Sequence, residues 1–114
     1  MSSHGAALAV YGSLVPGEKD HFVVRKIEGE WTPGTVRGFE FEVTWGPAEG
    51  YEGFLPDDSG NDVPVMILRS DRLEKNWRTI DDFHGDGFVR QLTPVTLDDD
   101  TVIDAWIYVA LTDS

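Results

Sequence analysis

The chain has 114 residues, of which 40% are hydrophobic and 11% aromatic, a composition typical of one folded domain over 1–114 rather than of a disordered protein. Its net charge of −12 argues against nucleic acid and anionic membranes as partners, because few cations are present to neutralise phosphate groups. The sequence contains no cysteine, which excludes disulfides and thiolate chemistry, and it lacks both a basic N-terminal region and a long apolar run, so we expect a cytoplasmic protein without signal peptide or membrane span.

The first half of the chain is predicted to hold strands, turns and one short helix. An apolar run over 6–11 predicts a buried strand. Acidic residues open the segment 18–27 and favour a short helix there, although Val23 and Val24 are β-branched. Further on, we expect a turn over 31–34, a strand over 35–44, a glycine-rich and aromatic loop over 45–56 that lines a pocket or covers the core, a polar connection over 57–62 and a strand over 63–68.

The second half is predicted to hold an amphipathic helix and a hairpin. Asp71 is in the N-cap position, Glu74 follows at the spacing of a capping box, and Gly85 marks the end of the helix. Strands over 88–97 and 101–111 form the hairpin. The order of elements predicts an α+β fold with five or six strands and two helices. The apolar stripe of the helix is Leu73, Trp77, Ile80 and Phe83.

Two segments carry the residues suited to act on a ligand. The first follows the opening strand, at 11–14, where a turn of small residues can point several backbone N–H groups at one anion. In this turn Gly12 permits unusual backbone angles and Ser13 adds a hydroxyl. The second segment is 80–90, Ile-Asp-Asp-Phe-His-Gly-Asp-Gly-Phe-Val-Arg. The sequence contains no glycine-rich motif for nucleotide binding and does not support a serine triad. Its three histidines are too dispersed to predict a metal site.

The two segments resemble the paired motifs of the gamma-glutamylcyclotransferase-like family, which includes the AIG2-like proteins. Residues 11–14 match a Tyr-Gly-Ser/Thr-Leu signature, and residues 80–90 resemble Leu-Asp-x-Phe-Glu-Gly-x-x-Tyr-x-Arg. The resemblance implies a small mixed twisted β-barrel with two flanking helices. It also implies a reaction in which the α-amino group of a gamma-glutamyl amine or amide attacks its own γ-carbonyl, which gives 5-oxoproline and a free amine. This chemistry requires no metal or organic cofactor.

Carried over to this chain, the resemblance makes His84 the proton shuttle, in the position of the family's catalytic glutamate, while Phe88 replaces a tyrosine. An imidazole can exchange protons near neutral pH. However, a helix C-terminus and nearby carboxylates favour its cationic form, which cannot accept a proton. Those carboxylates are Asp81, Asp82 and Asp86, each a weaker candidate for the shuttle. The substrate-binding loop would be Tyr11, Gly12, Ser13 and Leu14.

Two further residues have an open role. Arg90 is interpreted first as the partner of a structural ion pair and second as a substrate contact, and Tyr108 either packs in the hairpin core or faces the substrate. Three hypotheses follow: a cyclotransferase with an altered shuttle, a module that binds a small amino-acid-like ligand without turnover, or an acidic interaction protein with a vestigial pocket. The first two require that the turn at 11–14 and His84 face a common cavity of amino-acid size. The oligomeric state is not predicted.

Overall fold

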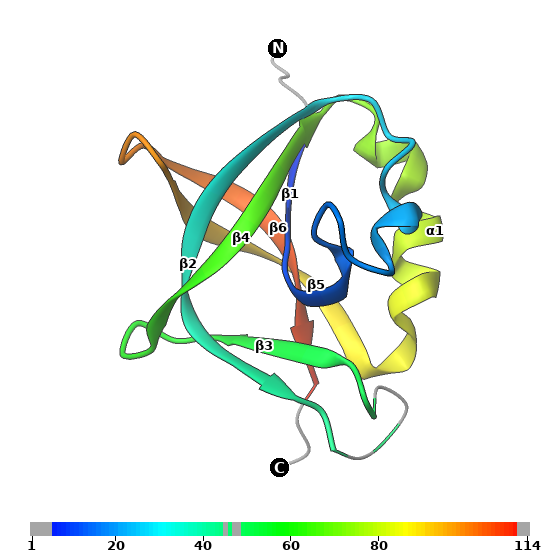
Figure 1. Cartoon of the computed structure of the whole chain (residues 1–114), viewed down its shortest axis with the longest axis vertical. Coiled ribbons are helices and arrows are strands. Elements are labelled where there is room, and N and C mark those ends of the chain that lie inside the picture. Colours follow the sequence, from blue (N-terminus) through cyan, green and yellow to red (C-terminus); the bar gives the residue numbers. More distant parts are fainter. Residues whose placement is uncertain (1–5, 45, 47–48, 112–114) are drawn as a thin grey trace.

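The computed structural model describes residues 6–44, 46 and 49–111, which form a twisted barrel with one helix on its side (Figure 1). Predictions for the N-terminal residues 1–5, for residues 45, 47 and 48 of the expected loop, and for 112–114 lie outside the described residues. The six strands are β1 (Ala6–Val10), β2 (Glu30–Glu42), β3 (Glu52–Pro56), β4 (Asn61–Ser70), β5 (Phe88–Leu97) and β6 (Val102–Ala110).

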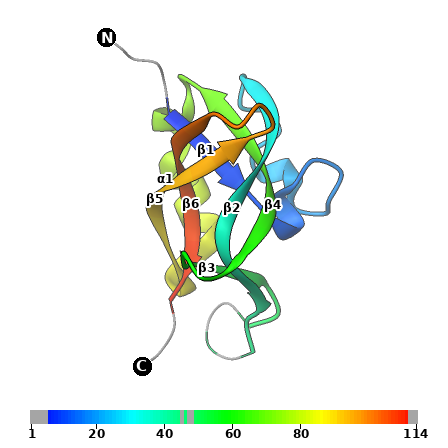
Figure 2. The same cartoon turned by 90° about the vertical axis from the view of Figure 1, so that its left-hand side faces the viewer.

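The strands follow the order β3-β2-β4-β1-β6-β5, and a further pairing of β2 with β5 closes five of them into a barrel (Figure 2). The β1–β6 pair is parallel and the other pairs are antiparallel, so the sheet is mixed as expected. Strand β3 lies outside the closed ring and pairs with β2. At the closing point a side chain on Gly34 would collide with the backbone of Thr96, so glycine lets the two strands meet.

Strand β1 is buried on both faces, which explains its unbroken apolar sequence. Ala7 and Ala9 belong to the core inside the barrel, whereas Leu8 and Val10 belong to a second core beneath the helix. The strand therefore ends between the two cores, and the turn that follows it emerges beside the helix.

Helix α1 (Leu73–His84) confirms the predicted amphipathic helix. Leu73 and Ile80 are fully buried, and the other two residues of the predicted stripe pack against the same core. The helix ends at Gly85, whose φ of 73° is in the left-handed region and whose N–H donates to the carbonyl of Asp81. This geometry sets the orientation of the last helical residue, His84.

Four predictions about the elements are wrong. The segment 18–27 contains only the 3₁₀ turn His21–Val23, the expected turn 31–34 lies within β2, and part of the expected loop forms β3. In each case contacts distant in sequence override the local pattern. The N-cap is Arg72 rather than Asp71, because the hydroxyl of Ser70 accepts the N–H of Arg72 at 3.0 Å and shapes the turn into the helix.

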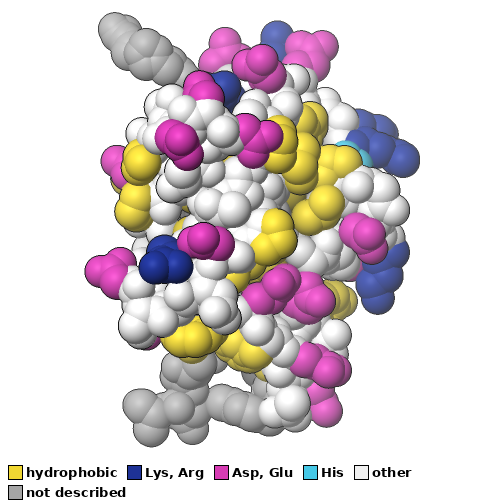
Figure 3. All heavy atoms as spheres, turned by 60° about the vertical axis from the view of Figure 1, so that its left-hand side comes forward, with side chains coloured by type: hydrophobic (Ala, Val, Ile, Leu, Met, Phe, Trp, Pro, Cys, Tyr) yellow, Lys and Arg dark blue, Asp and Glu magenta, His cyan; other side chains and the backbone are white. Residues whose placement is uncertain are grey.

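The acidic residues are not gathered in one place on the face shown in Figure 3, where they lie between small hydrophobic patches. Within the described ranges, no helix is both long and apolar enough to cross a membrane.

Candidate functional site

The turn after β1 presents two backbone donors. Its 3₁₀ turn, Gly12–Leu14, begins with Gly12 at a φ of 62°. The N–H groups of Leu14 and Val15 are used within the turn, bonded to the carbonyls of Tyr11 and Gly12. The N–H groups of Gly12 and Ser13 have no acceptor in the part of the chain that the structure describes. These two groups are therefore available to an anionic or carbonyl oxygen of a ligand.

Tyr11 fixes the turn to strand β6. Its buried hydroxyl donates to the carbonyl of Tyr108 at 2.6 Å. Burial, followed by the negative charges of Glu40 and Glu52, raises the pKa of Tyr11 far above its usual value of 10. The phenol therefore stays neutral and serves as a permanent donor. Its role here is to hold the binding turn in register with the barrel.

His84 has one bonded and one free ring nitrogen. Its Nδ1 lies 2.9 Å from the carbonyl oxygen of Ile80. A carbonyl can only accept, so Nδ1 must carry the proton and, in the neutral ring, Nε2 is left with its lone pair. The hydrogen bond one turn back along α1 thus selects the tautomer that can act as a base.

Aromatic rings surround the imidazole and change its titration. The ring is stacked on Tyr108 at 3.6 Å with an angle of 3°, and the edges of Phe83 and Phe88 contact it at 5.3 Å and 5.4 Å. This burial lowers the pKa of His84 below its usual 6.5 and outweighs the Ile80 carbonyl and the charge of Asp81, which act in the opposite direction. The expectation of a cationic imidazole is therefore wrong.

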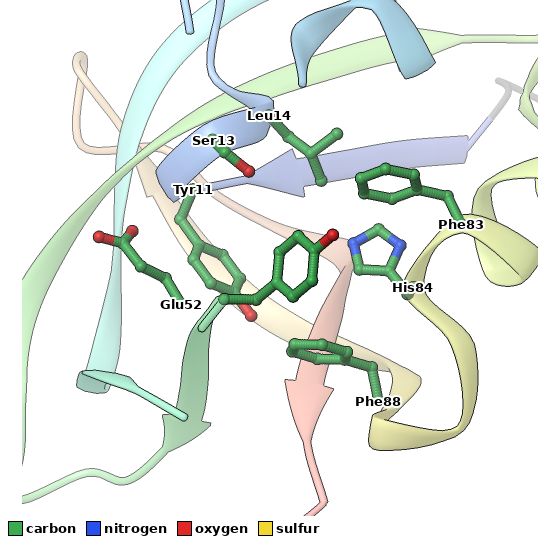
Figure 4. Close-up of a pocket in the computed structure, with 8 residues that line it drawn as sticks. Tyr11, Ser13, Leu14, Glu52, Phe83, His84 and Phe88 are labelled. Carbon is green, nitrogen blue, oxygen red and sulfur yellow. The ribbon is translucent and has the colours of Figure 1, made fainter. Parts of the chain in front are cut away.

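The turn and His84 do face a common cavity, which Figure 4 shows. The cavity measures about 30 Å³, enough for about two water molecules. The expected amino-acid size is wrong in this conformation, because aromatic side chains fill the space between the two segments. The lining residues are Tyr11, Ser13, Leu14, Tyr51, Glu52, Phe83, His84 and Phe88.

Arg90 and Tyr108 meet at Asp81, and these three residues line a groove other than this cavity. Arg90 forms a two-point ion pair with Asp81 at 3.1 Å and 3.2 Å, and the Tyr108 hydroxyl donates to the same carboxylate at 2.5 Å. The guanidinium lies 4.1 Å from the ring centre of Trp77 and 5.0 Å from that of Trp106. We call these five residues the Arg90 cluster. The ion pair that we favoured for Arg90 is present, and Tyr108 and Arg90 face a separate groove of about 580 Å³.

Within the Arg90 cluster, the negative charge of Asp81 is paired with the positive charge of Arg90. Hydrogen bonding to Arg90 is the main reason that the pKa of Asp81 lies below its usual 3.8. The pKa of Tyr108 is raised, first by burial and then by its bond to that carboxylate. All three groups keep one protonation state around neutral pH, so the cluster fastens α1 to β5 and β6 and offers no proton.

Sequence reasoning missed a carboxyl pair beside the binding turn. Glu52 is the one acidic residue among those lining the cavity, and a side chain on Gly12 would collide with its carboxyl. Partial burial, together with a hydrogen bond to Glu52 and its charge, raises the pKa of Glu40 to about 7. The signal was a pair of glutamates on neighbouring strands, but it was hidden because Glu52 fell in an expected loop.

The described residues contain no group of three or more His, Asp or Glu side chains placed to hold a metal ion. The chemical groups at the cavity are therefore Nε2 of His84, the backbone N–H of Ser13 and the carboxyl of Glu52, while the predicted binding residue Gly12 and the carboxyl of Glu40 line a separate groove.

The chain is thus a small closed mixed barrel in which the turn after the first strand and the polar residue that ends the helix line one cavity. The model of the family "Gamma-glutamyl cyclotransferase, AIG2-like" matches residues 8–114, so the chain belongs to that family.

Solved structures share the fold. An AIG2-like protein from Mus musculus is 22% identical, with a TM-score of 0.72 over 98% of this chain and 81% of that one. YkqA from Bacillus subtilis is 23% identical with a TM-score of 0.70; 92% of this chain aligns with 35% of YkqA, so the chain spans about a third of its length. A protein from Arabidopsis thaliana is 21% identical, with a TM-score of 0.68 over 100% and 74% of the two chains. None of the curated protein sequences compared with this chain matches it.

Proposed function

We propose that the protein is a gamma-glutamyl cyclotransferase in which His84 replaces the family's glutamate as the proton shuttle. Its substrate would be a gamma-glutamyl amine or amide, and its products 5-oxoproline and the free amine. One observation carries the proposal: a neutral imidazole, with Nδ1 bonded to the Ile80 carbonyl and Nε2 free, lines the same cavity as the motif-bearing turn.

The reaction needs one group that first takes a proton and then returns it. The neutral α-amine of the substrate attacks the γ-carbonyl carbon, and the electron pair of the C=O bond moves to oxygen. The proton of the attacking nitrogen passes to Nε2 of His84, and the imidazolium then gives it to the leaving nitrogen. The attack itself closes the five-membered ring, and the C–N bond to the leaving nitrogen then breaks as the carbonyl re-forms, which leaves 5-oxoproline and the free amine.

The surroundings of His84 suit both steps. A lowered pKa keeps the ring neutral at the start, when it must accept a proton. The Ile80 carbonyl then stabilises the imidazolium through the Nδ1–H bond. Among the residues that line the cavity, Ser13 supplies a backbone N–H suited to a substrate carboxylate or to the negative oxygen that forms during attack, whereas Gly12 lines a separate groove.

Binding without turnover is the second candidate, and both candidates require the cavity to open. A glutamyl group does not fit into about 30 Å³, so an aromatic wall residue must rotate outward to admit it. Tyr51, which is 45% exposed and touches Phe83 at 6.4 Å between ring centres, has the most room to do so. If the wall opens but the imidazole is poorly placed, the pocket holds the ligand and releases it unchanged.

The test is the release of 5-oxoproline from a panel of gamma-glutamyl amines by wild-type protein and by His84→Asn. Asparagine keeps a side-chain N–H for the Ile80 carbonyl but offers no base, so we expect turnover to fall about 100-fold with little change in the melting temperature. Thr79→Ala, an exposed change on the same helix, serves as the control and should leave turnover unaltered.

The variant His84→Glu separates the two candidates. Under the cyclotransferase proposal it retains turnover, because either side chain can shuttle the proton. If the wild type releases no 5-oxoproline, is stabilised thermally by the same compounds and gains turnover only as His84→Glu, the protein is a binder. Turnover that His84→Asn leaves intact would refute His84 as the shuttle.

A further inference from the structure

We infer that Tyr108 is a positioning residue for His84: its ring fixes the plane of the imidazole and so aims Nε2 into the cavity. The effect on catalysis rests on the proposed function, whereas the effect on the imidazole does not. The inference reassigns Tyr108, which the sequence analysis treated as a possible substrate contact.

The contact between the two rings is face to face. Their centres are 3.6 Å apart and their planes differ by 3°, whereas Phe83 and Phe88 meet the imidazole with their edges. Stacking restricts tilting of the imidazole, and the Nδ1 bond to the Ile80 carbonyl restricts its rotation. A half-turn of the ring would place a C–H group against that carbonyl and break the bond. The two restraints together leave one orientation for Nε2.

Tyr108 can hold another ring because it is itself held at both ends. Its hydroxyl donates to Asp81 at 2.5 Å, and Asp81 is clamped by the two-point ion pair with Arg90. Its backbone carbonyl accepts the hydroxyl of Tyr11 at 2.6 Å. Tyr108 is thus buried, and it is held by the binding turn through its backbone and by Asp81 through its hydroxyl.

A proton shuttle that is an imidazole depends more on a fixed orientation than one that is a carboxylate. A carboxylate presents two equivalent oxygens, so a rotated carboxylate still offers an acceptor. The imidazole has one free nitrogen, and it acts on two substrate nitrogens attached to the same carbon. Small errors in its direction therefore lower the rate, and restraint of the ring contributes to catalysis.

The first measurement is the NMR spectrum of wild-type protein labelled with ¹³C and ¹⁵N at histidine, with the His84 signals assigned by their loss in His84→Asn. A ring stacked at this distance shifts the carbon-bound protons of His84 upfield, and the nitrogen shifts should report an N–H at Nδ1. Unshifted His84 signals, or a mixture of tautomers, would overturn the inference.

The second measurement compares Tyr108→Phe with Tyr108→Leu. Phenylalanine keeps the stacked ring, so the upfield shift and most of the turnover should remain. Leucine removes it, so the shift should vanish and kcat should fall about tenfold with a smaller change in KM. Phe39→Leu, an exposed aromatic on β2, is the matched control for loss of a ring.

Other results contradict the inference in distinct ways. If Tyr108→Phe lowers turnover as much as Tyr108→Leu, the hydroxyl rather than the ring matters, and Tyr108 acts on the substrate. If Tyr108→Leu leaves the His84 signals in place, other residues hold the imidazole. If the wild type shows the upfield shift but no turnover, the proposed function fails while the positioning of His84 stands.

Discussion

The last turn of helix α1 carries two polar residues with opposite surroundings. Asp81 belongs to the Arg90 cluster, where two nitrogens of Arg90 and the hydroxyl of Tyr108 all bond to its carboxylate. His84 faces the cavity, where one ring nitrogen is bonded and the other has no partner among the described residues. The stacked ring of Tyr108 connects the two places.

The difference separates polar groups that hold the fold from polar groups that can act on a ligand. In the Arg90 cluster the neighbours favour the charged state of Asp81, so folding and ionisation support each other. In the cavity, burial opposes the charged state of His84, and beside the binding turn burial and then the carboxyl of Glu52 oppose that of Glu40. Such disfavoured charges are common where proteins do chemistry.

The largest effect is expected from Asp81→Asn, which removes the charge at the centre of the Arg90 cluster. Arg90 loses its two-point partner and Tyr108 its acceptor, so the free energy of unfolding at pH 7 should fall by about 2 kcal/mol, a figure reduced for the partial exposure of the pair. The folded-state pKa of Asp81 is depressed, so its contribution is present above its usual 3.8 and is lost as the pH falls through the lower folded value.

Urea denaturation at pH 7 measures this loss, with Asp82→Asn as the control on the same helix. Equal midpoints for the two variants would show that the cluster does not stabilise the fold. A loss that persists unchanged at low pH would show that packing rather than charge is responsible.

Local sequence signals were sufficient for much of this architecture. The apolar run of β1, the stripe and terminal glycine of α1 and the final hairpin each depend on near neighbours, and all of them form close to where they were predicted. The family motifs likewise located the turn and His84, which line one cavity. The ion pair of Arg90 could be predicted for a similar reason, because its partner Asp81 lies only nine residues away in the sequence.

What the sequence concealed depends on contacts across the barrel. Strand β3 exists because β2 supplies its hydrogen bonds, and without that pairing Glu52 could not be placed beside the turn. The hydroxyl of Tyr11 bonds a residue 97 positions away. The protonation of His84 depends on three rings brought together by folding, so local charges alone gave the wrong direction.

A smaller effect of opposite sign is expected from Glu40→Gln in the cavity region. The pKa of Glu40 is about 7 in the fold, above its usual 4.5, so its contribution is present below 4.5 and is lost as the pH rises through 7. Glutamine imitates the protonated carboxyl at every pH. At pH 8 the variant should therefore be more stable than wild type by on the order of 1 kcal/mol, a figure that allows for the exposure of this group.

At pH 5 the difference should nearly vanish, which thermal denaturation at the two pH values would show. Glu49→Gln in the exposed turn before β3 is the control. Equal melting temperatures for wild type and Glu40→Gln at pH 8 would mean that the carboxyl pair is not strained, and the contrast with the Arg90 cluster would be lost.

The smallest expected effect is a change in the pKa of His84 when the Arg90 cluster is altered. Burial is the largest influence on that pKa and lowers it below 6.5, while the charge of Asp81 raises it and so opposes burial. Asp81 is the group whose charge acts on the ring, and Arg90 and Tyr108 both bond to its carboxylate; Tyr108 also covers the ring directly, and Glu52 lines the same cavity. Asp81→Asn should therefore lower the pKa of His84 further.

NMR titration of His84 measures this change, at a temperature where circular dichroism shows both proteins folded. Since the folded-state pKa is depressed, stability is retained above 6.5 and falls as the pH drops through the folded value. Turnover should rise through the same range, because only the neutral ring accepts a proton, and loss of the proton from the substrate's α-ammonium group should add a separate rise at higher pH. A pKa that rises in Asp81→Asn would mean that loss of the cluster lets water reach the imidazole, so that the cluster controls the site by burial and not by charge.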